Sequence, residues 1–370
     1  MHTRTRTLTA LAGTSIAALA LAGCAATAPQ AEVTGLSIVA STNVYGDIAA
    51  TLGGDFVTVT SIIESAAQDP HSYEASAQDQ LAIANADIVI ENGGGYDPFI
   101  DVLVEGSGTE AIVISAVEAS GMLEGDVHAE GEHAEGEHAE EEHADETTAD
   151  DHVHEGDDHD HAHEGDEHAD EAHSDEAHSD EAHSEGDDHE GHSHIEGFNE
   201  HVWYEIHAIE GLAEAVTAAL SEADADNAST YQANLAAFLD ELEALEAEIE
   251  TVAASIGSGA VAVTEPVPTY LLAELGLTDE TPADFVEAIE EGADVSPLAL
   301  QQTLDLVSSG ELRLLAYNEQ TTSPETERVL AAAEAAGVPV VSFTETLPEG
   351  EDYVSWMRAN VTAVAAALGA

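Results

Sequence analysis

The segment DQLAIANADIVIENGGGYDPFIDVL (residues 79–103) sets the fold class of this chain. It begins with apolar residues at helical spacing and continues with a β-branched run at Ile88–Ile90. A glycine-rich turn at Gly93–Gly95 then leads into a second helical pattern. A strand placed between two helices is typical of a parallel sheet that is covered by helices on both faces. The segment therefore predicts an α/β fold.

The same alternation of strands and helices continues on both sides of this segment. Upstream, LSIVAS and FVTVTSII predict two short buried strands, with the glycine-terminated helical pattern YGDIAATLGG between them, and downstream EAIVISA predicts a fourth strand. We assign residues 36–125 to an N-terminal α/β lobe. Because ligands of such sheets bind beyond the carboxyl ends of the strands, the loop DPHSYE places His71 where functional residues concentrate.

The charge of the chain restricts its partners. Its 370 residues contain 77 Asp and Glu against 5 Lys and Arg, which gives a formal net charge of -72. Such a chain repels nucleic-acid phosphates and anionic membrane surfaces, so we expect no nucleic-acid partner and favour a cationic one. Outside the densest acidic segment, the alternative to a cationic partner is that the acidic residues form a solvated surface without a specific partner. The length suggests two compact domains plus additional material.

The first residues have the features of an export signal. A short positive region with two arginines precedes the apolar run Leu8–Ala22, which is too short for a comfortable membrane span. LAGC then resembles the lipobox of bacterial lipoproteins, with cleavage before Cys24 and a lipid attached to it. We predict a lipoprotein signal peptide over residues 1–23, a flexible tether over 24–35, and an exported chain anchored by lipid to the outer face of the cytoplasmic membrane.

Residues 126–194 interrupt the α/β pattern with an acidic, histidine-rich segment. Histidines recur in two series with a step of five residues, which would spread the imidazoles around every face of a helix. Since the segment has almost no large apolar residues, we predict that it is disordered.

Imidazole and carboxylate groups together suit borderline divalent metals such as zinc, and histidine-rich tracts are typical of metal binding. The alternative is a solvated acidic linker. Ordering such a chain is entropically costly, which favours many weak sites over one fixed site. The predicted auxiliary ligands are His128, His133, His138, His143, His152, His154, His159, His161, His163, His168, His173, His178, His183, His189, His192 and His194.

Order resumes after the histidine-rich segment. GFNEHVWYEIHAIEGLAEAVTAAL predicts a helix that begins near Trp203, and residues 195–223 complete the N-terminal lobe. The pattern that follows predicts a linking helix over residues 224–255, capped at Asp226 or Asn227 and long enough to cross from one lobe to another.

A second α/β unit occupies residues 256–370. AVAVTEP predicts a strand that ends at Glu265, ELRLLAYNE one that ends near Asn318, and GVPVVSFTE one that ends at Glu345. Helices are expected between these strands, and a final helix is expected over Tyr353–Leu368. The C-terminal lobe, like the N-terminal lobe with His71, therefore has polar residues at or near the ends of its predicted strands.

Six motifs, taken in order, carry a resemblance to a known family. STNVYGDIA, DPHSYEASAQD, ADIVIENGGGYDPFID, NEHVWYEI, VAVTEPVPTYLLAELGL and YVSWMRANVTAVAAAL resemble the solute-binding lipoproteins of zinc and manganese ABC transporters. The acidic, histidine-rich insertion is similar to that of the zinc-type members. The resemblance covers essentially the whole mature chain and implies two doubly wound lobes joined by one long helix, with a metal held in the cleft between them.

The resemblance also implies a ligand set. His71 matches the first histidine ligand and His201 the second. Glu265 occupies the third position, where zinc members often have histidine and manganese members have glutamate, and Glu345 falls where the family usually has aspartate. Two neutral imidazoles and two carboxylates neutralise a dication, and zinc outranks manganese at such a site. We therefore expect Zn²⁺, with Mn²⁺ as the alternative.

Three further residues are expected close to the ligands. Glu205 is four residues beyond His201, one turn away on a shared helix, and is predicted to orient it. Tyr73 is predicted to pack near the site, and Asn318 to donate a hydrogen bond to a ligand carboxylate. The alternatives are structural: a turn residue for His71, a residue at a helix start for His201, and surface carboxylates for Glu265 and Glu345.

Three classes of function compete. The first is a tethered receptor that hands a metal to the permease of an ABC importer, and we expect it to be a monomer. The second is an exported metalloenzyme, but the sequence has no H-E-x-x-H motif and no nucleophile elbow, and a catalytic zinc would need an open coordination position. The third is a metal buffer or adhesin that acts through the histidine-rich segment. The sequence favours the receptor and predicts that the protein is not an enzyme.

Overall fold

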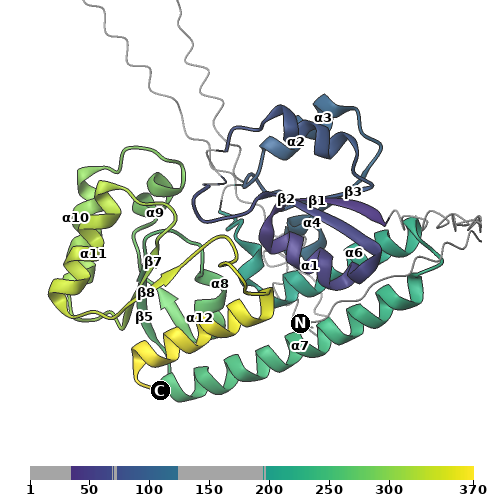
Figure 1. Cartoon of the computed structure of the whole chain (residues 1–370). Coiled ribbons are helices and arrows are strands. Elements are labelled where there is room, and N and C mark those ends of the chain that lie inside the picture. The colour runs from purple at the N-terminus through teal and green to yellow at the C-terminus, as the bar shows by residue number, and fades with distance from the viewer. Residues whose placement is uncertain (1–34, 69, 71–72, 124–194, 196) are drawn as a thin grey trace, which may run out of the picture.

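Two parallel four-stranded sheets form the framework of the chain. The structure is a computed structural model that describes residues 35–68, 70, 73–123, 195 and 197–370. The strand order is β2-β1-β3-β4 in the first sheet and β6-β5-β7-β8 in the second, and every pairing is parallel. Each sheet lies in its own lobe (Figure 1). The predicted α/β class with two doubly wound lobes is confirmed.

The N-terminal lobe contains all four strands that the sequence predicts. Their central positions in the sheet explain the nearly continuous apolar runs of β1 and β3, because both faces are covered by helices. The elements of this lobe are β1 (Leu36–Thr42), α1 (Asn43–Gly53), η1 (Gly54–Phe56), β2 (Val57–Ile63), α2 (Ala77–Ala84), β3 (Ile88–Glu91), α3 (Phe99–Ser107), β4 (Ile112–Ser115) and α4 (Ala116–Ser120).

The helix predicted from Trp203 begins later than expected. Trp203 lies in a short 3-10 helix, η2 (Val202–Tyr204), and the α-helix α6 (Ile206–Ala223) starts only after Glu205. The reason is local: the Glu205 carboxylate accepts a hydrogen bond from the backbone N–H of Ala208 at 2.5 Å, so Glu205 caps α6 instead of continuing an earlier turn.

The predicted long helix is present as α7 (Ala228–Ile256), but it begins four residues after the predicted start at residue 224, and the side chain of Asn227 makes no capping hydrogen bond. It begins directly after Asn227 and ends at Gly257, whose positive φ of 70° suits a helix terminus. Its 29 residues correspond to a length of about 44 Å. The helix packs against α1 and α6 of the first lobe and against α8 and α12 of the second, and Figure 1 shows it running beneath both.

The C-terminal lobe repeats the strand order of the first. The predicted strands are present, but β5 and β8 end two residues before Glu265 and Glu345, which leaves both glutamates in loops. The three-residue edge strand β6 was not predicted. The elements of this lobe are β5 (Gly259–Val263), α8 (Thr269–Glu274), β6 (Leu277–Asp279), α9 (Ala283–Glu290), α10 (Pro297–Ser308), β7 (Leu314–Asn318), α11 (Pro324–Ala336), β8 (Val340–Phe343) and α12 (Tyr353–Leu368).

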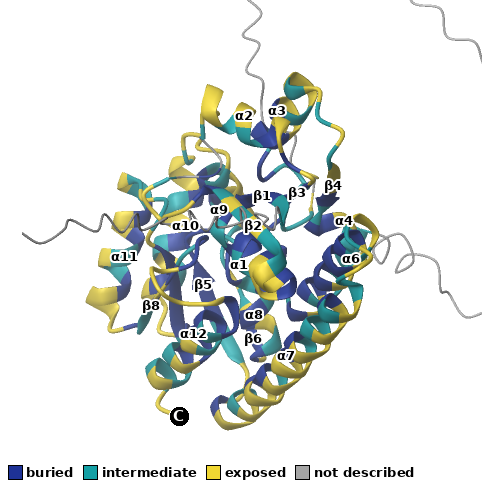
Figure 2. Cartoon of the chain, turned by 45° about the vertical axis from the view of Figure 1, so that its right-hand side comes forward, coloured by how far each residue is buried: buried dark blue, intermediate teal, exposed yellow. Residues whose placement is uncertain are grey.

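One hydrophobic cluster joins the two lobes. It contains buried residues of β1, β3, α6, α7, β5, β7 and α12, and in Figure 2 the strands and inner helix faces are buried while the outer faces of α7 and α11 are exposed. Tyr204 and Trp356 pack with ring centroids 5.3 Å apart, and the Tyr353 hydroxyl donates to the carbonyl of Trp203 at 2.8 Å. Among the helices of the described residues, none combines the length and the hydropathy of a membrane-spanning segment.

Candidate metal site

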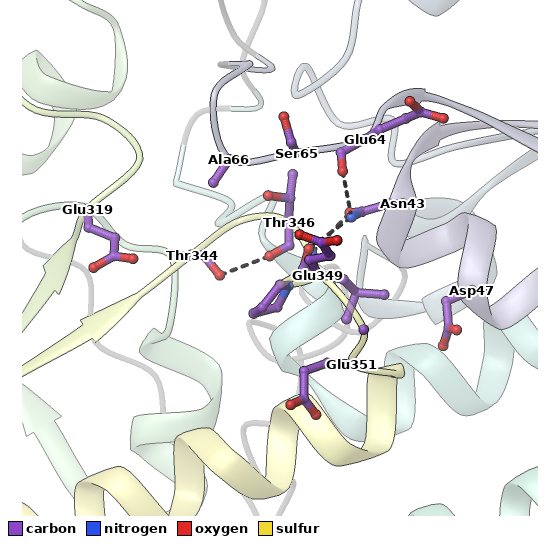
Figure 3. A pocket seen from close by; sticks show the side chains of 13 residues that line it. Asn43, Asp47, Glu64, Ser65, Ala66, Glu319, Thr344, Thr346, Glu349 and Glu351 are labelled. Atoms are coloured by element: carbon purple, nitrogen blue, oxygen red, sulfur yellow. Dashed lines mark hydrogen bonds between the residues drawn. The ribbon is translucent and has the colours of Figure 1, made fainter.

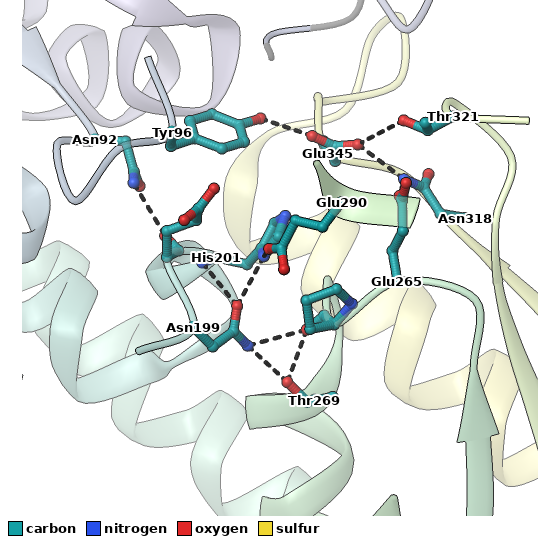
Figure 4. A network of polar contacts seen from close by, with 12 residues as sticks. Asn92, Tyr96, Asn199, His201, Glu265, Thr269, Glu290, Asn318, Thr321 and Glu345 are labelled. Atoms are coloured by element: carbon teal, nitrogen blue, oxygen red, sulfur yellow. Dashed lines mark hydrogen bonds and ion pairs between the residues drawn. The ribbon is translucent and has the colours of Figure 1, made fainter. Parts of the chain in front are cut away.

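Three of the four predicted ligands lie buried where the two lobes meet, a region that we call the inter-lobe interface. His201 comes immediately before η2, Glu265 follows β5 and Glu345 follows β8. Their exposed fractions are 1%, 5% and 1%, although glutamate is almost never fully buried unless it is paired and histidine is buried only to an intermediate extent. Figure 4 shows them in one network of polar contacts. His71 lies outside the described residues, as do Cys24 and the sixteen histidines predicted as auxiliary ligands.

Asn318 bridges the two carboxylates of the C-terminal lobe. Its side-chain amide donates hydrogen bonds to Glu265 and, at 2.8 Å, to Oε1 of Glu345. The predicted hydrogen bond from Asn318 to a candidate ligand is therefore present, and it reaches both carboxylates. The backbone N–H of Asn318 donates to the Thr264 hydroxyl at 2.9 Å, which fixes the end of β7 beside the loop that carries Glu265.

Tyr96 connects Glu345 to the N-terminal lobe. Its hydroxyl donates to Oε2 of Glu345 at 2.9 Å, and its ring lies edge-on to the His201 ring at a centroid distance of 5.7 Å. Burial, followed by the charge of Glu345, raises the pKa of Tyr96 well above its ordinary value, so the hydroxyl remains a donor. Tyr96 was not predicted from the sequence, although it directly follows the predicted glycine-rich turn Gly93–Gly95.

The turn that presents Tyr96 is held by Asp97. Its carboxylate accepts hydrogen bonds from the backbone N–H groups of Asn92 at 2.7 Å and Gly93 at 2.9 Å. Gly93, with a φ of 74°, is the residue type that this left-handed conformation favours. Burial raises the pKa of Asp97 to about 6 against the lowering effect of these hydrogen bonds. The turn is thus fixed in the conformation that aims Tyr96 at Glu345.

Asn199 is the principal polar neighbour of His201 and was also missed. Its Oδ1 lies 2.7 Å from Nδ1 of His201, and its Nδ2 donates to the carbonyl of Pro266 at 3.0 Å and to the Thr269 hydroxyl at 2.6 Å. Glu290 of α9 approaches the same Nδ1 at 3.9 Å. The only sequence signal for Asn199 is its position two residues before His201.

The helical arrangement assumed for Glu205 is wrong. His201 and Glu205 do not share a helix, because α6 begins after Glu205. One oxygen of Glu205 caps that helix, and the other lies 3.4 Å from Nδ1 of His207. The side chain of His207 is 72% exposed. The observed partner that orients His201 is Asn199 instead.

The observed contacts of Tyr73 lie within the N-terminal lobe, and its predicted packing near the metal stays a prediction. Its ring packs on Phe99 at a centroid distance of 4.9 Å, and its hydroxyl donates to Asp79 at 2.9 Å. Asp79 also closes the capping box of α2 with Ser76. These contacts therefore tie Tyr73 to α2 and α3 of the N-terminal lobe.

Two acidic hollows lie along the inter-lobe interface. One, of about 450 Å³, is lined by Asp47 and Glu64 from the first lobe and by Glu319 and Glu349 from the second (Figure 3). The other, of about 490 Å³, is lined by residues 195 and 197–200 and by acidic residues of the β6–α9 region. A negative lining attracts cations to the interface.

The fold and the buried polar network define a class of protein. Two parallel-sheet lobes share one long helix, and histidine, carboxylate and amide groups from both lobes meet between them, which is the arrangement of a two-lobe solute-binding receptor. More specifically, residues 38–367 match the family described as zinc-uptake complex component A, periplasmic, and the chain belongs to that family. Its members are metal-binding receptors of ABC importers, and it is not a family of enzymes.

Known relatives and structures agree with this assignment. A putative metal-binding protein of Treponema pallidum is 22% identical over 330 residues, which cover 89% of this chain and 86% of the relative. The manganese-binding lipoprotein MntA of Halalkalibacterium halodurans is 33% identical over 100 residues, and this match spans only 33% of that relative. The periplasmic zinc-binding protein TroA of Treponema pallidum has a similar fold, with a TM-score of 0.61, 15% identity, and coverage of 91% of this chain and 100% of that one.

Proposed function

We propose that this protein captures Zn²⁺ between its lobes and delivers it to the permease of an ABC importer, with Mn²⁺ as the alternative cargo. One observation carries the proposal: His201 of the N-terminal lobe and the two carboxylates Glu265 and Glu345 of the C-terminal lobe are buried at the same interface. Tyr96 and Asn318 join them in one network. Buried carboxylates require a compensating charge or donor, and a divalent cation supplies it.

The proposed ligands are His71, His201, Glu265 and Glu345. Two neutral imidazoles and two carboxylates compensate the charge of a dication, and nitrogen and oxygen ligands in this number suit zinc. The amide of Asn318 now lies between the two carboxylates, so it supplies the donors that they need before an ion arrives. Binding then replaces part of an amide–carboxylate network with a stronger charge interaction.

The choice of zinc over manganese rests on the chemistry of the ligands. At a site with imidazole and carboxylate groups, divalent affinities increase from manganese to zinc, so manganese selectivity would have to come from geometry and supply. The glutamate at position 265 is the feature that favours manganese, because a carboxylate is the harder ligand. The histidine-rich segment 126–194 favours zinc, and we propose that it raises the local concentration of the ion.

The location and the release step are also part of the proposal. A lipid on Cys24 would hold the mature monomer at the outer face of the cytoplasmic membrane, beside the permease. Ligands that come from both lobes would be separated when the permease moves the lobes apart, and the ion would be released.

A competitive zinc and manganese titration of the mature protein tests whether the inter-lobe interface binds the metal. We expect one tight equivalent that is lost in His201→Ala, in His71→Ala and in Glu265→Gln. His207→Ala is the matched control, since the His207 side chain is 72% exposed and forms its ion pairs with Glu205 and Glu246, not with Glu265 or Glu345. Retention of the tight equivalent in His201→Ala would exclude the proposed site.

A second candidate function is metal buffering by residues 126–194. The observation that favours it is the regular recurrence of histidine in that segment. Deletion of these residues separates the two functions: a receptor retains its tight equivalent, whereas a buffer loses all its capacity. We expect the tight equivalent to remain and the weak ones to disappear.

A further inference from the structure

The side-chain amide of Asn199 is held in one orientation. The carbonyl of Pro266 can only accept a hydrogen bond, so the group that faces it at 3.0 Å is Nδ2. The backbone N–H of His201 can only donate, so the group that faces it at 3.1 Å is Oδ1. Both ends of the amide are thus assigned by partners whose hydrogen-bonding roles are fixed.

This orientation determines the tautomer of His201. Nδ1 of its ring lies 2.7 Å from Oδ1 of Asn199, and a carbonyl oxygen only accepts, so Nδ1 carries the proton. In the neutral imidazole the lone pair is then on Nε2, which is the nitrogen that can bind a metal. A hydrogen bond to the other ring nitrogen is the usual means of fixing a metal-binding histidine.

The groups that hold Asn199 belong to the other lobe. Its side chain donates to Pro266 and Thr269, and its backbone carbonyl accepts a hydrogen bond from the Tyr270 hydroxyl at 2.7 Å. All three follow Glu265 closely in the chain. The orientation of His201 in the first lobe is therefore fixed by Pro266 and the start of α8, the segment that directly follows the proposed ligand Glu265 of the second lobe.

We propose that Asn199 is a positioning residue that makes the presentation of His201 to the metal depend on contact with the C-terminal lobe. The proposal rests on the proposed function of His201 as a ligand. When the lobes separate, Asn199 loses its partners Pro266, Thr269 and Tyr270, and the imidazole loses its fixed tautomer and direction. Lobe opening would then weaken the hold on the ion twice, by removing the carboxylates and by releasing His201.

The tautomer is read directly from the imidazole N–H proton in the NMR spectrum of the full mature chain without metal. A buried, hydrogen-bonded Nδ1–H exchanges slowly with water, and the signal is assigned by its loss in His201→Gln. We expect Asn199→Leu to abolish this signal, and Asn199→Asp to retain it because the carboxylate still accepts the Nδ1–H bond. Tyr270→Phe, which removes only one bond to Asn199, should speed the exchange of this proton.

The matched control is Asn43→Leu. Asn43 also crosses the inter-lobe interface, where it donates to the carbonyl of Leu347 at 3.0 Å and accepts from the Leu347 N–H at 3.0 Å. Its hydrogen bonds go to Leu347 and to the carbonyl of Glu64, and not to the His201 network drawn in Figure 4. If Asn199 only helps to hold the lobes together, the two variants affect the His201 signal alike; if it positions the ring, only Asn199→Leu removes the signal.

Zinc affinity, measured by competition with a chelator, completes the test. We expect a loss of about 10- to 100-fold in Asn199→Leu, as for other residues that orient metal ligands. An unchanged affinity together with a persistent N–H signal in Asn199→Leu would overturn the inference alone. Retention of tight zinc binding in His201→Gln would instead overturn the proposed function. A folded state common to all variants is verified by their circular dichroism spectra.

Discussion

The hydroxyl of Tyr96 in the N-terminal lobe donates a hydrogen bond to Glu345 in the C-terminal lobe, at 2.9 Å and with both side chains almost fully buried. The two residues are 249 positions apart in the chain. Their contact shows that the lobes meet through polar groups at the proposed site and not only through the hydrophobic cluster beneath it. The closed arrangement is therefore stabilised by the same carboxylate that is proposed to bind the ion.

Tyr96→Phe should destabilise the protein without metal. The substitution retains the ring and its contacts but removes one buried hydrogen bond to a charged group, which contributes about 1.5–3 kcal/mol. We expect the free energy of unfolding in urea to fall by about 2 kcal/mol. Tyr317→Phe is the control, because Tyr317 is also buried but makes no hydrogen bond through its hydroxyl within the described residues. Equal losses in the two variants would contradict a specific role for the Tyr96–Glu345 bond.

Glu265→His should shift the preference of the site toward zinc. A third imidazole replaces a carboxylate, and imidazole suits zinc whereas carboxylate oxygens suit manganese. We expect the ratio of zinc to manganese affinity to rise by about tenfold, which corresponds to about 1.4 kcal/mol. The measurement is a competition titration with both ions. Glu311→His, at an exposed position of the C-terminal lobe, should leave the ratio unchanged; an unchanged ratio in Glu265→His would show that residue 265 does not contact the ion.

Asn318→Leu should make the protein more dependent on its ion. Without the amide, Glu265 and Glu345 lose the hydrogen-bond donor that they share. The repulsion between the two carboxylates is then less well offset. We expect the free energy of unfolding without metal to fall by about 2 kcal/mol, the usual cost of leaving a charged acceptor unsatisfied. The rise in melting temperature on adding zinc should then exceed that of the unmodified protein. A smaller rise would mean that Asn318 assists metal binding and does not substitute for it.

The sequence predicted the parts of the fold that depend on local patterns. The apolar runs around β1 and β3 and the long helix α7 follow from the periodicity of their own residues, and they were found within a few positions of the predicted bounds. The edge strand β6 has only three residues and too short a pattern to recognise. The start of α6 was misplaced because a glutamate at a helix start serves as a cap, a role that its sequence pattern does not reveal.

The sequence could predict the candidate site residues of the C-terminal lobe because they lie at or near the ends of predicted strands. Glu265, Asn318 and Glu345 follow parallel strands, and the carboxyl ends of such strands meet at one edge of the sheet. Tyr96 and Asn199 acquire their roles from partners in the other lobe, 249 and 67 residues away, and no local pattern encodes such contacts. The same limitation explains the assignment of Glu205 to His201, which assumed a helix that tertiary contacts do not form.

Stability should depend on pH through Glu274 of α8. Burial, together with the charges of Glu205 and Glu246, raises the pKa of Glu274 from 4.5 to about 7, against the lowering effects of His207 and the Ile206 N–H. The groups that face it come from α6, α7 and, through Tyr353, α12. Because the folded state binds this proton more tightly than the unfolded chain, the stabilisation is complete below about pH 4.5 and is lost as the pH rises through 7.

Glu274→Gln removes the charge that develops on Glu274 at high pH. We therefore expect the variant to melt at a higher temperature than the unmodified protein at pH 8, with the difference reduced at pH 5, where Glu274 is protonated in the folded state. Thermal unfolding at both values of pH measures this, with Glu311→Gln as an exposed control. His207→Ala adds a second check, because loss of the imidazole should raise the pKa of Glu274 further and extend the stabilised range to higher pH. A difference in melting temperature that does not change with pH would show that Glu274 is ionised throughout.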